Sequence, residues 1–124
     1  MPQLRSAPQQ AHRTAVESSI QDVVRYLQEV LGQKLTAYIA GVSDPRTVGR
    51  WAGGERAPRV ENEQRLRCAY HVFQLLLDEE APQTIRAWFL GLNPQLDDES
   101  PAESIRKNMF RETLLAAKAF LAGA

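Results

Sequence analysis

The apolar residues of this chain recur at intervals of three and four positions along nearly its whole length. The clearest run consists of Val16, Ile20, Val23, Val24, Leu27, Val30 and Leu31. This spacing places side chains on one face of an α-helix, and no segment alternates polar and apolar residues long enough to be a strand. The pattern predicts an all-α protein, a compact bundle of about six or seven helices that contains a helix–turn–helix.

Capping residues and helix breakers predict where these helices begin and end. Thr14 and Glu17 match a T-x-x-E capping box, so the first helix is expected to begin there and to end at Gly32. A second, shorter helix is expected to carry Leu35 and Ile39 and to end at Gly41. The remaining helices are expected to begin at or near Pro45, Asn62, Pro82, Ser100 and Phe110. The fourth and fifth helices are expected to bury Leu66, Ala69, Phe73, Leu76, Leu77, Ile85, Trp88, Phe89 and Leu92.

The length of 124 residues suits one domain, or two small lobes that share a core. We divide it into a flexible tail (1–12), a helix–turn–helix DNA-binding region (13–80) and a C-terminal helical protein-binding region (81–124). No apolar run approaches a membrane span, and the N-terminus lacks the apolar core of a secretory signal. The single cysteine, Cys68, excludes an internal disulfide. We expect a cytoplasmic protein that does not bind membranes.

The formal net charge of zero hides an uneven distribution of charged residues. Residues 34–67 contain seven basic and four acidic side chains, whereas residues 68–104 contain one basic and seven acidic ones. The last twenty residues are basic again. Such blocks predict two surfaces with different partners.

The stretch DPRTVGRWAGGERAPR, residues 44–59, predicts a short helix with two different faces. Asp44 is a good N-cap, Pro45 suits the first helical position, and two glycines follow after about two turns. Before it, Gly41 permits the left-handed backbone that a sharp corner between helices requires. Val48 and Trp51 are expected to face the core.

The opposite face of this helix is polar and basic. Arg46 and Arg50 are four residues apart and Thr47 lies beside them, so the three share an exposed face. Arginine can pair with guanine through two hydrogen bonds, and threonine can contact a thymine methyl group or a phosphate. We therefore predict binding to double-stranded DNA, with contacts from Lys34, Ser43, Arg46, Thr47, Arg50, Arg56 and Arg59.

These residues also resemble a known group. GVSDPRTVGRWAGGERAP is similar to the Xre-type helix–turn–helix, and Trp88, Asn93, Pro94, Leu96 and Pro101 match a pattern in the C-terminal region of the Xre/MbcA/ParS antitoxin family. The resemblance covers about residues 30–124. It implies a type II antitoxin that represses its own operon and neutralises a RES-domain toxin, an NAD-degrading enzyme. It also implies that the toxin is contacted by Lys118, Phe120, Leu121, Ala122, Gly123 and Ala124.

Several alternatives remain open at the level of the sequence. The chain fits a stand-alone DNA-binding repressor without a toxin, or a protein-interaction module whose motif has lost contact with DNA. The first helix suits either the core or a dimer seam. One short recognition helix reads only a few base pairs, which favours a homodimer on a near-palindromic site.

No pattern indicates catalysis, a cofactor or a metal. Cys68 and His71 share a helix face, but two potential ligands do not make a zinc site. The acidic stretch DDES, residues 97–100, lacks the spacing of a calcium loop, and WAGGERA lacks the Lys-Ser/Thr pair of a phosphate-binding loop. We expect a protein that is not an enzyme and needs no cofactor.

Overall fold

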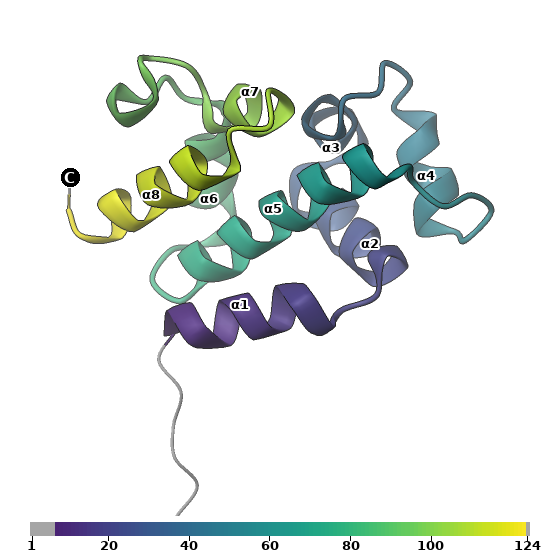
Figure 1. Ribbon diagram of the computed structural model, residues 1–124, viewed down its shortest axis with the longest axis horizontal. Coiled ribbons are helices and arrows are strands. Elements are labelled where there is room, and N and C mark those ends of the chain that lie inside the picture. The colour runs from purple at the N-terminus through teal and green to yellow at the C-terminus, as the bar shows by residue number, and fades with distance from the viewer. Residues whose placement is uncertain (1–6, 124) are drawn as a thin grey trace, which may run out of the picture.

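The computed structural model describes residues 7–123, which form eight α-helices and one short 3₁₀ turn (Figure 1). They are α1 (Ala7–Glu17), α2 (Ile20–Leu31), α3 (Gln33–Ala40), α4 (Arg46–Ala52), α5 (Val60–Leu77), α6 (Pro82–Leu90), η1 (Pro94–Leu96), α7 (Pro101–Arg106) and α8 (Phe110–Leu121). No strand occurs in the described range. The predicted all-α class is confirmed.

Helix α5 is the axis of the bundle. Figure 1 shows α1 and α8 on opposite sides of it, and α2 and α3 also pack against it. The side chains that α5 buries include Leu66, Ala69, Val72, Phe73, Leu75 and Leu76. Since side chains are buried around much of its circumference, this helix ties the N-terminal and C-terminal helices into one core.

Aromatic side chains connect three of the helices. The ring of Phe73 on α5 lies 5.5 Å from that of Tyr26 on α2 and 6.4 Å from that of Phe89 on α6. Trp88 packs edge-on against Phe89 at 5.4 Å. Phe89 is fully buried and Trp88 is partly buried against the same cluster. Both aromatic residues of α6 therefore belong to the core of this chain.

The N-terminal part differs from the prediction. The sequence predicts a tail over residues 1–12 and a helix beginning at Thr14, but a helix already begins at Ala7, and residues 1–6 lie outside the described range. The first helix ends at Glu17. The Ser19 hydroxyl then accepts the backbone N–H of Asp22 at 3.1 Å and caps the start of α2. One predicted helix is thus two, which adds an eighth helix to the bundle.

Packing explains why α1 forms in spite of its polar composition. Its small residues Ala11 and Ala15 are buried against α5. Arg67 of α5 donates from Nη1 to the carbonyls of Ala15 at 3.1 Å and Ser18 at 2.8 Å, and so caps the end of α1. Helices in proteins are stabilised mostly by such tertiary contacts, which composition does not reveal.

The apolar stripe of α2 belongs to the core. Val23, Val24, Leu27 and Leu31 are all buried within the single chain. They are therefore not available as a dimer seam, which decides between the two roles that the sequence left open.

Two leucines predicted to be buried are exposed. Leu77 is 36% exposed because it is the last residue of α5, and Leu75 is buried in its place. Leu92 is 79% exposed because α6 ends at Leu90 and Gly91 turns the backbone into an extended conformation. Leu92 shows that the helical spacing can continue past the point where the helix ends.

The start of α7 follows its sequence signals. The Ser100 hydroxyl accepts the backbone N–H of Glu103 at 3.1 Å, and Pro101 is the first helical residue.

Among residues 7–123, no helix combines the length and the apolar character that crossing a bilayer requires.

Candidate nucleic-acid interface

The corner between α3 and α4 depends on Gly41. Its φ of +89° is left-handed, and its N–H and that of Val42 both donate to the Ala37 carbonyl at 3.0 Å. A Cβ atom at this position would lie 2.5 Å from Nη1 of Arg65. The left-handed backbone therefore favours glycine, as the sequence predicts, and an added Cβ would also make the Arg65 side chain move.

Two side chains of helix α5 stabilise this corner by hydrogen bonds. The Ala40 carbonyl at the end of α3 accepts from Nδ2 of Asn62 at 2.8 Å and from Nη1 of Arg65 at 3.0 Å. Nε of Arg65 also donates to Oδ1 of Asn108 at 2.9 Å, which connects the corner to the turn before α8. Sequence reasoning missed both α5 residues, because their partners lie far away along the chain.

Helix α4 is anchored by its apolar face. Val48, Trp51 and Ala52 are buried against α2 and α3, as predicted for the first two. The carbonyl of Ala52 accepts from Nε2 of Gln21 and from Nε of Arg25, both at 3.1 Å. Burial of a valine and an indole contributes about 1.5–3 kcal/mol each. A helix of only two turns is thereby fixed in one orientation.

The outward face begins with a pair of opposite charges. Asp44 accepts from Nε and Nη2 of Arg46, each at 3.1 Å, and from the backbone N–H of Arg46 at 3.0 Å. The helix begins at Arg46 and Pro45 takes the N-cap position, one residue later than predicted, yet the Asp44 side chain still caps the first turn. The hydrogen bonds from Arg46 lower the pKa of the Asp44 carboxyl and raise the pKa of Arg46.

This pairing leaves one edge of the Arg46 side chain open. A guanidinium has five N–H donors, and Asp44 occupies the side formed by Nε and Nη2. The end formed by Nη1 and the second Nη2 hydrogen remains free to bind another flat acceptor pair. The Arg46 side chain is 80% exposed, so that end is accessible.

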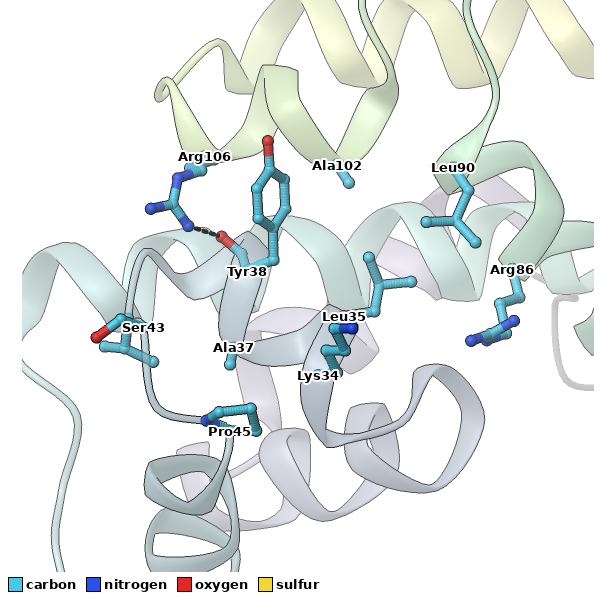
Figure 2. A pocket seen from close by; sticks show the side chains of 11 residues that line it. Lys34, Leu35, Ala37, Tyr38, Ser43, Pro45, Arg86, Leu90, Ala102 and Arg106 are labelled. Carbon is cyan, nitrogen blue, oxygen red and sulfur yellow. Dashed lines mark hydrogen bonds between the residues drawn. The ribbon is translucent and has the colours of Figure 1, made fainter.

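The other predicted DNA-binding residues lie on two sides of the corner. Thr47, Arg56 and Arg59 line a hollow of about 510 Å³ beside α4, together with Asn62 and Arg65. Lys34 and Ser43 line a separate cavity of about 530 Å³ on the other side of the turn (Figure 2). Arg46 and Arg50 line neither of these two hollows.

The residues that the resemblance implies for toxin binding lie at the end of α8. Lys118, Ala122 and Gly123 are exposed, and Ala124 lies outside the described range. Phe120 and Leu121 are partly buried against the core, and the Phe120 ring lies 6.3 Å from that of Trp88. The two apolar members of the set therefore take part in packing within the chain.

Three side chains on another face carry no sign of catalysis. Burial raises the pKa of the Cys68 thiol to about 12, so the nucleophilic thiolate is absent at neutral pH. The ring of His71 lies 5.4 Å from that of His12, a neighbour that the sequence did not indicate because we placed His12 in a tail. In the part of the chain that is described, no three His, Cys, Asp or Glu side chains are grouped closely enough to hold a metal ion.

Comparison with known proteins gives one distant similarity. Over 81 residues the chain is 27% identical to the mycobacterial cidal antitoxin MbcA of Mycobacterium bovis and of two strains of Mycobacterium tuberculosis. The alignment covers 65% of this chain and 72% of the relative. No protein-family model matches the chain, and no solved structure matches it. The similarity agrees with the antitoxin part of the resemblance described above.

Proposed function

We propose that the chain is the antitoxin of a toxin–antitoxin pair and that it binds double-stranded DNA through α4. The observation that carries the antitoxin role is the similarity to MbcA over most of both chains. The partner implied by the family resemblance is a RES-domain toxin. In this role the chain acts by binding and not as an enzyme.

The DNA-binding part of the proposal is supported by the two faces of α4. Val48 and Trp51 fix the helix from inside, while Arg46 is exposed and Thr47 and Arg50 are partly exposed. A helix about 10–12 Å across fits the major groove, which is about 12 Å wide. A rigid helix that carries two arginines can therefore place both near base edges.

Asp44 gives Arg46 a defined orientation for this task. The ion pair holds the guanidinium by one side, and its free end matches the O6 and N7 acceptors of guanine. An arginine that is already ordered loses less conformational entropy when it binds. We assign Arg46 and Arg50 to base contacts.

The flanking basic and hydroxyl side chains are assigned to the sugar-phosphate backbone. Lys34 and Ser43 lie on one side of the corner, and Thr47, Arg56 and Arg59 lie on the other. Phosphate contacts position a protein on DNA and make its affinity depend on salt. Two copies on a near-palindromic site would supply the sequence specificity that one short helix lacks.

The toxin-binding part rests on the end of α8. We assign the first contacts to Lys118, Ala122 and Gly123, which are exposed. Phe120 and Leu121 would have to leave their places beside the core to enter a toxin. The partly buried state of these two residues also favours the second candidate, a stand-alone DNA-binding repressor without a toxin.

One experiment separates the two candidates. The neighbouring reading frames are searched for a RES-domain protein, the full chain is co-expressed with it, and growth and cellular NAD are measured; the absence of such a neighbour favours the stand-alone repressor. We expect the chain to restore both, and a Lys118→Glu variant with an added Gly123→Trp to restore them less, while Arg46→Ala has no effect. If the RES-domain protein is toxic and the wild-type chain neither binds it nor restores growth, the antitoxin role is wrong and the stand-alone repressor is favoured.

A further inference from the structure

The cavity of about 530 Å³ in Figure 2 lies between α3 on one side and α6 and α7 on the other. It is bounded by α3, the turn that leads into α4, α6 and α7. Figure 2 shows Leu90 of α6 and Ala102 of α7 on the side facing Leu35 of α3. Ala37 and Val42 add to an interior that is mostly apolar. Such a volume lies within the usual range for small-molecule sites, about 300–1,000 Å³.

Three cationic side chains line this cavity and no carboxylate does. They are Lys34, Arg86 and Arg106, and Figure 2 places the two arginines at opposite ends. Within residues 7–123, none of the three takes part in an ion pair. Each of the three therefore lacks a directly paired carboxylate in that range and can contact an anionic group.

The two arginines are held in place by neutral groups. Nη1 of Arg106 donates to the Tyr38 carbonyl at 2.7 Å, and its guanidinium carbon lies 4.6 Å from the centre of the Tyr38 ring. Nε of Arg86 donates to the Leu31 carbonyl at 3.4 Å. Glu103, the acidic residue close to Arg106, instead accepts from the Tyr38 hydroxyl and lies 3.6 Å from Nζ of Lys107. Donors on both guanidinium groups thus remain for a ligand.

We infer that this cavity binds a small apolar molecule that carries an anionic group such as a carboxylate. The apolar walls would bury its hydrocarbon part, and the cations at the rim would pair with its charge. The apolar walls and the cations line the same concave space. This shape favours a small-molecule ligand over a partner protein with a flat surface.

A consequence follows for DNA binding, and this consequence rests on the proposed function. Lys34 and Ser43 line the cavity and are also assigned to the DNA backbone. A bound anion that neutralises Lys34 removes a phosphate contact, so the ligand would weaken DNA binding. The binding of the ligand itself does not depend on DNA.

The test uses the full chain without DNA and three probes of equal length: decanoate, decyltrimethylammonium and 1-decanol. Titration calorimetry below the micelle concentration measures each affinity. We expect decanoate to bind with 1:1 stoichiometry, decanol to bind at least about tenfold more weakly, and the cationic probe not to bind.

Two sets of variants locate the site. Leu90→Trp fills the mouth of the cavity and should abolish binding, whereas Leu115→Trp, at a leucine of similar exposure (53% against 50%) on α8, should not. Lys34→Gln with Arg86→Gln should weaken decanoate binding about tenfold. Arg111→Gln with Lys118→Gln makes the same change in charge away from this cavity and should have little effect.

Several results would overturn the inference. They are equal binding of the anionic and cationic probes, no binding of monomeric decanoate, or equal effects of Leu90→Trp and Leu115→Trp. Binding to phosphatidylglycerol vesicles without binding of the monomeric acid would point to a membrane surface instead. A dimer that Leu90→Trp separates, with no decanoate binding, would assign the cavity to a second copy of the chain. If the wild-type chain binds decanoate but does not bind DNA, only the proposed function is wrong.

Discussion

The carboxylate of Asp44 holds the guanidinium of Arg46 through Nε and Nη2, each at 3.1 Å, on the outward side of α4. An acidic residue at the edge of a surface proposed to bind DNA is unfavourable by charge alone. Its value lies in orientation, since the pair leaves the free end of Arg46 directed away from Asp44. The two effects of Asp44 have opposite signs and can be measured separately.

Asp44→Asn tests this orientation. The amide oxygen can still cap the first turn, but the charge that holds Arg46 is lost. We expect affinity for random DNA to stay the same or to rise, while affinity for the specific site falls, so that their ratio decreases roughly fivefold. Parallel binding curves on both DNAs give the ratio. A ratio that does not change would show that Asp44 has no part in positioning Arg46.

Gly41→Ala tests the corner between α3 and α4. Alanine is disfavoured in the left-handed backbone conformation, and its Cβ would contact Arg65. We therefore expect the free energy of unfolding to fall by about 1–2 kcal/mol and the Tm to fall by roughly 5 °C. Gly91→Ala is the control, because Gly91 has a φ of −81° and a Cβ there would have an ordinary contact of 3.4 Å. It should change Tm little. Equal decreases for the two variants would remove the special role of Gly41.

The salt dependence of DNA affinity tests the backbone contacts. If Arg56 neutralises one phosphate, Arg56→Gln should lower the slope of log K against log salt by about one unit. The loss should be similar for specific and random DNA, because phosphates carry no sequence information. Arg111→Gln serves as the control on α8. A slope that Arg56→Gln leaves unchanged would place this side chain away from the DNA.

The stability of the chain should decrease in mild acid because of His71. Burial, His12 and Lys118 lower the pKa of His71 below its ordinary value of about 6.5. The unfolded chain then binds the proton more tightly, so the contribution of neutral His71 to stability is fully present above about pH 6.5 and is lost as the pH falls through the lowered pKa. Arg67 and Arg111 line the same hollow as His71 and His12, and Arg67 is paired there with Glu63 at 2.8 Å.

Thermal unfolding between pH 8 and pH 5 measures this effect. His71→Gln should reduce the decrease in Tm over this range, since glutamine does not titrate. If the decrease is the same in the variant, another group causes it.

Local signals in the sequence account for the parts of the fold that were predicted well. Gly41 and Ser100 act through their own backbone or their next turn, so neighbouring residues suffice to predict them. Val48 and Trp51 were placed correctly because spacing alone separates the two faces of α4. At the candidate interface, these local signals therefore predict which face of α4 is buried.

Long-range packing accounts for the parts that were missed. Helix α1 is stabilised by Ala11 and Ala15 against α5 and by the cap from Arg67, none of which is visible in its own composition. The hydrogen bonds from Asn62 and Arg65 to Ala40 join segments far apart along the chain. The cavity beside Lys34 has the same origin, because three separate helices and a turn enclose it.

The most direct test of the account is a comparison of two double variants in DNA binding. Wild type, Arg46→Ala with Arg50→Ala, and Arg111→Ala with Lys118→Ala are titrated with the DNA upstream of the gene and with random DNA. The α4 variant should lose roughly a hundredfold or more in specific affinity, and only a few-fold on random DNA, because each paired guanine contact contributes a factor of about ten. The α8 variant should keep the specific affinity. If both variants bind the specific DNA as the wild type does, α4 does not read DNA and the account is contradicted.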